Sequence, residues 1–280
     1  MNYVKQFGVK PGSKVDLAKV DAGFTDTHES HEHALPEIET YTQKMHDLQY
    51  LLYAEGKRSL LICLQGRDAA GKDGTINHVL GTMNPQGCTV TGFKVPTKEE
   101  AAHDFLWRYH QRTPGKGQVA IFNRSHYEDV LVVRVHDLVP KDVWSKRYEQ
   151  INEFEKMLCN NGTHILKFYL HIDPEEQLAR FKQRLDDPAR HWKISESDYS
   201  ERKLWPQYVK AFEEAMQETS TRHAPWFVIP ANHKWFRDLA ISQIVASTME
   251  GMGLKLPPTQ VDLADIRRKY HAAKQARAKT

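Results

Sequence analysis

A short apolar run that leads directly into a glycine-rich loop constrains the fold of this chain more than any other feature. Residues 59–65 read SLLICLQ, and residues 66–75 follow as GRDAAGKDGT. A buried strand that runs into such a loop, with a helix behind it, is typical of a parallel α/β sheet. In the pattern G-x-x-x-x-G-K, glycines let backbone N–H groups face one anion and the lysine reaches the outer phosphates. We therefore expect a phosphate site formed by Gly66, Ala69, Ala70, Gly71, Lys72 and Asp73.

Four more apolar runs follow at α/β intervals: CTVTGFKV, QVAIFN, HILKFYLHI and WFVIPA. Helical periodicity appears before the first strand, at residues 37–55, and between or after later strands at 99–111, 143–159 and 235–249. Five strands that alternate with helices predict an α/β fold of the P-loop kinase type, with a doubly wound five-stranded parallel sheet.

The domain organisation follows from what this alternation leaves over. Residues 1–36 show no clear period and are predicted to form an extended leader over the surface. The stretch before the last strand is far longer than one crossover needs, so residues 174–215 are predicted to be an inserted helical lid. The core then comprises residues 37–173 and 216–255, and residues 256–280 form a basic tail.

Composition excludes several classes of protein. The net charge of +3 is too small to indicate nucleic acid as a partner. The three cysteines have no metal or redox spacing, which favours a reducing compartment. No apolar run approaches the roughly 18 residues that span a bilayer, so we expect a cytoplasmic protein without a membrane partner. The basic tail favours a solvated helix end over a nucleic-acid or polyanion arm.

Negative charge inside the phosphate loop raises the question of a metal. Asp73 replaces the Ser or Thr that normally binds magnesium after the lysine, and Asn123 stands where a Walker B aspartate is expected. Asp68 is then the natural ligand for Mg²⁺, which would bridge its carboxylate to phosphate oxygens. The alternative is that Asp68 only caps the helix. Asp73 is better explained as a residue that complements the helix dipole.

Basic side chains outside the loop extend the predicted site. Arg124 can offer a planar fork to phosphate oxygens, although a structural salt bridge is the alternative. Four cations of the lid are expected to bind phosphate when the lid closes: Arg180, Arg184, Arg190 and Lys193. The alternative is that they are solvated charges balanced by Asp186 and Asp187.

Four segments together resemble polyphosphate kinase family 2: GRDAAGKDGTINHV, FNRSHYEDVLVVRVH, RFKQRLDDPARHWKIS and TSTRHAPWFVIPANHKWFR. The second segment resembles the class III members, which phosphorylate nucleoside monophosphates and diphosphates. The resemblance implies a reversible transfer of the terminal phosphoryl group of inorganic polyphosphate to AMP or ADP. It implies Mg²⁺ as the cofactor, with Mn²⁺ as a substitute, adenine and in some members guanine nucleotides as acceptors, and a homo-oligomer.

Site residues carried over from the family fall into two groups. Asp68 and Lys72 would be the central catalytic pair, with Arg67 and Arg124 neutralising charge. The nucleotide would lie near Asn123, Tyr127, Glu128 and Arg134. Two alternatives remain: an ATP-dependent nucleoside monophosphate kinase, whose loop is expected to keep the Ser or Thr, and a noncatalytic module that binds polyphosphate or nucleotide.

Overall fold

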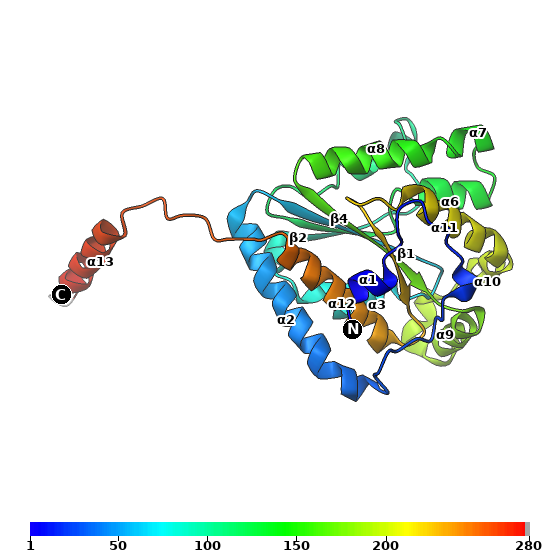
Figure 1. Cartoon of the computed structure of the whole chain (residues 1–280), viewed down its shortest axis with the longest axis horizontal. Coiled ribbons are helices and arrows are strands. Elements are labelled where there is room, and N and C mark those ends of the chain that lie inside the picture. The colour runs from blue at the N-terminus through cyan, green and yellow to red at the C-terminus, as the bar shows by residue number, and fades with distance from the viewer. Residues whose placement is uncertain (278–280) are drawn as a thin grey trace.

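A five-stranded parallel sheet forms the centre of the molecule (Figure 1), and the computed structural model describes it together with the rest of residues 1–277. The strand order is β2-β3-β1-β4-β5. The strands are β1 (Ser59–Gly66), β2 (Cys88–Gly92), β3 (Val119–Asn123), β4 (Thr163–His171) and β5 (Trp226–Pro230). The predicted five-stranded parallel sheet is confirmed. The chain passes from β1 to one side of the sheet and returns to the other side at β4, so the carboxyl end of β1 lies at the switch point where ligands bind.

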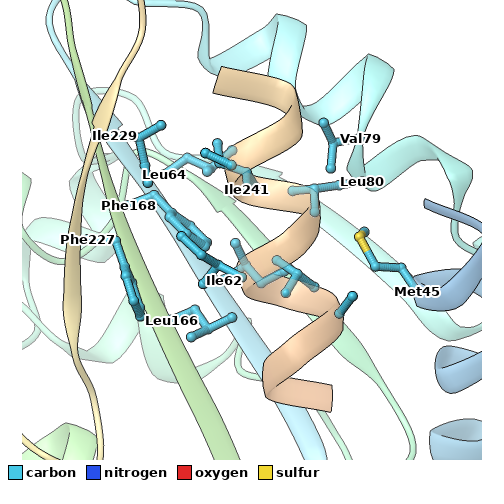
Figure 2. Packing of buried hydrophobic residues seen from close by; sticks show 14 of the residues in the cluster. Met45, Ile62, Leu64, Val79, Leu80, Leu166, Phe168, Phe227, Ile229 and Ile241 are labelled. Atoms are coloured by element: carbon cyan, nitrogen blue, oxygen red, sulfur yellow. The ribbon is translucent and has the colours of Figure 1, made fainter. Parts of the chain in front are cut away.

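Both faces of the sheet are covered by helices. On one face lie α2 (His31–Glu55) and α12 (Lys234–Gly251), and on the other lie α6 (Glu128–Val135), α8 (Arg147–Asn160) and α11 (Trp205–Thr219). Strand β1 alternates between two apolar clusters, which explains why its sequence is apolar throughout. Figure 2 shows Ile62 and Leu64 of β1 packed with Phe168 against Ile241 of α12. The phosphate loop therefore extends from a central strand in which all eight residues are buried.

The amino-terminal segment differs from the extended leader that the sequence predicts. It contains helix α1 (Tyr3–Phe7) and a 3₁₀ turn at Leu17–Lys19, and Tyr3 is fully buried in the core. Helix α2 begins at His31, six residues before the expected start, because the Ser30 side chain accepts a hydrogen bond from the His33 amide. The segment packs against the core although its sequence has no clear period, because burying the aromatic rings of Tyr3 and Phe7 is favourable.

Two predicted helices are each divided in two. The stretch 99–111 forms α4 (Lys98–Ala101) and α5 (Trp107–His110), and the stretch 143–159 is covered by α7 (Lys141–Trp144) and α8. Between α4 and α5 the Asp104 carboxylate accepts a hydrogen bond from the Leu106 amide, a local bond that competes with the helix.

The remaining helical elements position the loop and its surroundings. Helix α3 (Lys72–His78) begins directly at the loop lysine. The insertion before β5 holds α9 (Pro174–Asp186), a 3₁₀ helix η4 (Pro188–Lys193), α10 (Glu196–Lys203) and α11. Helix α13 (Leu263–Arg277) lies away from the body (Figure 1), and the last three residues of the predicted basic tail lie outside the described residues. Within residues 1–277, no helix is both long enough and apolar enough to cross a membrane.

Candidate active site

The loop between β1 and α3 depends on glycine at two positions. A Cβ atom on Gly66 would lie 3.0 Å from the Ala70 Cβ atom and 3.1 Å from the Leu170 carbonyl oxygen. Gly71 has a φ of +108°, and a Cβ atom there would lie 2.0 Å from Nη1 of Arg237. A side chain would be crowded at Gly66 and strained at Gly71 by its positive φ, so glycine lets the backbone curl tightly around an anion at this loop.

Lys72 folds back over this loop. Its Nζ atom donates to the Gly66 carbonyl oxygen at 2.7 Å and to the Arg67 carbonyl oxygen at 3.3 Å. Burial and the nearby Arg124 guanidinium lower the pKa of Lys72 to about 8. An ammonium held by carbonyl oxygens at the start of a helix can turn to an incoming phosphate without large movement of the backbone.

Asp68 and Arg124 bring the phosphate loop and the turn after β3 together. Arg124 has a φ of +64°, and its Nη2 atom donates to Oδ1 of Asp68 at 3.0 Å while Nη1 donates to Glu128 at 3.1 Å. Burial opposes the charge of Arg124, but the two carboxylates outweigh it and raise the pKa. The salt bridge that the sequence left as an alternative is therefore present, and it holds the guanidinium at the cavity wall.

Asp73 has a second role besides its place in the first turn of α3. Its Oδ1 atom accepts a hydrogen bond from Nδ2 of Asn123 at 2.9 Å, and its Oδ2 atom lies 3.5 Å from Nζ of Lys193. Burial alone would raise its pKa, but these partners lower it. Asp73 thus joins the end of β3 and the lid to the phosphate loop.

Arg180 is buried and gives its donors to the protein. Its guanidinium donates to the carbonyl oxygens of Ala69 (2.8 Å), Ala70 (3.0 Å), Ala231 (2.5 Å) and Asn232 (2.9 Å), and Nε donates to Glu176 at 2.6 Å. The expected contact with phosphate would require some of these bonds to break. In the structure, Arg180 instead fixes α9 to the phosphate loop.

The other cations of the lid are less constrained. Arg190 pairs with Asp187 at 2.8 Å, as the solvated alternative anticipated for this residue. Arg184 instead donates to the Lys193 carbonyl oxygen at 3.0 Å and lies 3.7 Å from Asp198. The side chains of Arg184, Arg190 and Lys193 nevertheless line the cavity above the loop. The Arg190–Asp187 pair is about half-exposed and therefore weak, so Arg190 remains available to a stronger anion.

The cavity above the loop has a volume of about 950 Å³. Asp68, Gly71, Lys72, Asp73, Asn123 and Arg124 line it together with the lid. Sequence reasoning missed three further cations in its wall: Lys94, Lys234 and Arg237. Each follows the carboxyl end of a strand, β2 or β5, and this position was the signal that could have identified them. Arg237 is 1% exposed and is held by Asp238 at 2.7 and 2.9 Å.

Six predicted site residues do not line the cavity: Gly66, Arg67, Ala70, Tyr127, Glu128 and Arg134. Arg67 lies between the rings of Trp205 and Tyr208, 4.5 Å from each, and donates to a carbonyl oxygen of α10. Tyr127 is fully buried, and Arg134, mostly buried itself, donates to Glu214 of α11 at 2.8 Å. Direct contact of Tyr127 or Arg134 with a nucleotide, and of Arg67 with the transferred charge, is therefore not supported. Glu128 reaches the site through Arg124.

The carboxylates at the cavity suit a metal ion that is held by one or two protein ligands and takes the others from water and substrate. Residues 1–277 contain no cluster of three or more His, Cys, Asp or Glu side chains that could hold a metal. Magnesium is usually bound by one or two carboxylates, with water and substrate phosphates completing its coordination. Asp68, which is partly exposed at the cavity, fits this pattern.

The glycine loop at the end of β1, its lysine and the helical insertion above it define a phosphate-binding α/β protein of the P-loop kinase type. The chain belongs to the polyphosphate kinase 2 family, whose model matches residues 28–257. It is 48% identical to the AMP/ADP-polyphosphate phosphotransferase of Meiothermus ruber over 91% of this chain and 96% of that protein. It is 44% identical to the ADP-polyphosphate phosphotransferase of Rhodopseudomonas palustris over 91% of this chain and 92% of that protein.

A solved structure agrees with this assignment. The crystal structure of polyphosphate kinase 2 from Arthrobacter aurescens superposes with a TM-score of 0.93 and 39% sequence identity, over 97% of each chain. The similarity thus extends well beyond the loop to the insertion and to almost the whole chain.

Proposed function

We propose that this enzyme transfers the terminal phosphoryl group of inorganic polyphosphate to AMP or ADP. Membership of the polyphosphate kinase 2 family and the activities named for its relatives support this function. The structural observation that carries it is the lining of the cavity, where Lys72, Arg124 and the lid cations surround one glycine loop. Such a concentration of cations suits a donor that carries a negative charge on every phosphate unit.

The reaction requires positioning and charge stabilisation more than covalent chemistry. A phosphate oxygen of the acceptor nucleotide attacks the terminal phosphorus of the polyphosphate, and the bridging P–O bond to the next unit breaks. The shortened polyphosphate leaves with the electron pair of that bond. Lys72 and Arg124 are placed to stabilise the charge that develops on the transferred group. One phosphoanhydride is broken and another is formed, which makes the reaction reversible.

Magnesium is part of the proposal. Asp68 would hold it, and the ion would supply positive charge that offsets the charge of the phosphate groups. Manganese has the same preference for oxygen ligands and would substitute for it. Arg124 already orients the Asp68 carboxylate at the cavity wall, so the protein fixes one ligand in advance.

A donor assay tests the function. The pure protein is incubated with Mg²⁺ in two series. In the first, polyphosphate is the donor and AMP or ADP the acceptor; in the second, ATP is the donor and AMP the acceptor. We expect ADP and ATP to form with polyphosphate and little transfer from ATP. Transfer from ATP alone would establish the monophosphate kinase instead, and binding of polyphosphate without turnover would establish a noncatalytic module. Parallel reactions with GMP and GDP measure base preference, and the mass in solution tests the proposed homo-oligomer.

A Lys72→Ala variant separates the loop from the rest of the molecule. We expect the variant to fold as the wild type does and to lose phosphoryl transfer. Full activity in this variant would contradict the role of the loop lysine.

A further inference from the structure

A fully buried charge network lies beneath the turn that carries Arg124. Lys167 in the middle of β4 and Glu155 on α8 are both completely buried, and their ion pair measures 2.7 Å. The Lys167 ammonium also donates to the Tyr127 hydroxyl at 2.8 Å and to the Thr219 carbonyl oxygen at 2.7 Å. An ammonium has three protons, and each of them has an acceptor here.

The second oxygen of Glu155 binds the turn from the same side. Oε1 accepts a hydrogen bond from the Tyr127 hydroxyl at 2.8 Å and lies 3.1 Å from Nε2 of His126, which is also fully buried. Two consecutive residues of the turn are thereby tied to one carboxylate. That carboxylate is in turn fixed by Lys167.

A buried ion pair is seldom more stabilising than apolar side chains of the same size. The network is therefore poorly explained by stability alone. Its position suggests another reason. The network joins the turn after β3, through His126 and Tyr127, to strand β4 and to helices α8 and α11. A well-satisfied polar network can specify one arrangement of a segment where apolar packing would tolerate several.

The turn itself divides into an anchored side and an active side. Ser125 accepts a hydrogen bond from Nε2 of Gln65 at 3.2 Å, and His126 and Tyr127 reach the network. Arg124 projects the other way, where it meets Asp68 and Glu128. Its backbone has a φ of +64°, a conformation that a residue with a side chain keeps only when its surroundings impose it.

We propose that Glu155 and Lys167 are positioning residues for phosphoryl transfer, which they support by holding the turn at residues 124–128 so that Arg124 faces Asp68. This inference rests on the proposed function. The network also includes the Thr219 carbonyl oxygen at the end of α11, the helix by which the inserted segment returns to the sheet. It therefore ties the turn that carries Arg124 to the end of α11 as well as to the sheet.

The test removes both charges together. In a Glu155→Leu/Lys167→Met variant of the full chain, the side chains keep similar volume and no unpaired charge is left in the core. The melting temperature should fall, because the Tyr127 hydroxyl, the His126 ring and the Thr219 carbonyl oxygen lose partners in the core. At a temperature where the variant is folded, amide hydrogen exchange at residues 124–128 should speed up by about tenfold or more relative to the rest of the sheet. We expect kcat to fall by about 100-fold, because small misplacements of a charged group at a reacting centre have effects of that size. The KM values for both substrates should change far less.

A double-mutant cycle shows whether the effect acts through Arg124. In an Arg124→Lys background the network should matter much less, so the two changes should not multiply. A Val245→Ala variant, which truncates a buried side chain of α12 outside the network, is the control for a general loss of stability. It should lower the melting temperature and leave the exchange of the turn unchanged relative to the rest of the sheet.

Two results would overturn the inference. One is wild-type kcat and wild-type exchange at the turn in the double variant, which would make the network a matter of packing. The other is a kcat loss from the double variant that is as large in the Arg124→Lys background as in the wild type, because the network would then act independently of Arg124. If the double variant does not fold, Tyr127→Phe is the second variant: it keeps the ion pair and the His126 contact and removes the hydroxyl link to the turn, so a smaller loss of kcat with faster exchange at residues 124–128 is expected, and wild-type values of both would overturn the inference. If the wild type transfers no phosphoryl group from polyphosphate, the proposed function fails, and the exchange measurement still decides whether the network holds the turn.

Discussion

Replacing Arg180 with alanine tests whether this arginine holds the loop or binds phosphate. The guanidinium donates to four carbonyl oxygens, two in the phosphate loop and two after β5, and it is 5% exposed. Each hydrogen bond contributes about 1 kcal/mol net. The loss of all four predicts a decrease in the free energy of unfolding of about 4 kcal/mol. The ion pair with Glu176 adds little, since that carboxylate is partly exposed.

The assay is thermal and urea unfolding, followed by kinetics at a temperature where the variant is folded. A decrease of about 4 kcal/mol lowers the melting temperature of a chain of this size by roughly 10 °C. We expect Arg180→Lys to recover only part of this loss, because an ammonium cannot reach four acceptors in a planar array. Arg184→Ala is the matched control from the same helix. It should raise the KM for polyphosphate with a smaller loss of stability than Arg180→Ala, because Arg184 donates to one carbonyl oxygen where Arg180 donates to four.

The reasoning is refuted by the opposite pattern. If Arg180→Ala melts within a degree or two of the wild type and its main defect is a raised KM for polyphosphate, then Arg180 is a phosphate ligand. The prediction from sequence would then be right, and the hydrogen bonds to the loop would be incidental.

Three further changes address the loop and its metal. Gly71→Ala should abolish transfer, because its Cβ atom would lie 2.0 Å from Arg237, whereas Gly251→Ala has open space around it and should be active; an active Gly71→Ala would refute the tight loop. Above pH 8 the Lys72 ammonium loses its proton, so kcat/KM for polyphosphate should fall about tenfold per pH unit. In Lys72→Arg this alkaline fall should be absent, and a fall that persists would assign it to another group. Asp68→Asn should raise the Mg²⁺ concentration for half-maximal activity by about tenfold or more, the loss of one charge-assisted contact; an unchanged requirement would remove Asp68 as the ligand.

The sheet could be predicted from sequence because its signals are local. Each strand is an apolar run of strand length, and the loop motif fixes the position of the first one. The start of α2 was predicted too late because the prediction used the spacing of apolar residues, which begins at residue 37. The helix begins at His31 because the Ser30 side chain caps it, and Ser30 is not part of the apolar pattern. The amino-terminal segment was missed because the burial of Tyr3 depends on α12, far away in the sequence.

The chemistry of the site was predictable in kind but not residue by residue. Asp68, Lys72 and Arg124 do converge, since all three follow the carboxyl ends of adjacent strands. The partners of a long basic side chain, by contrast, depend on three-dimensional contacts. Arg180 binds carbonyl oxygens more than 50 residues away in both directions, and Arg67 stacks on two rings of α11. No local pattern distinguishes such arginines from one that faces a substrate.

The two acids of GRDAAGKDGT can be understood through their partners. Asp68 is paired with Arg124 from the turn after β3, and Asp73 lies next to Lys193 from the lid. Each acid holds in place a cation that lines the cavity, in a pair that is partly exposed and therefore weak. Polyphosphate carries more charge than a single carboxylate, so it can take over Arg124 and Lys193 at little cost. Release of Arg124 would then leave the Asp68 carboxylate free beside the bound phosphates, where a divalent cation would be needed to offset the repulsion between them. On this argument the acids do not oppose phosphate binding, because they keep the cations ordered before the substrate arrives.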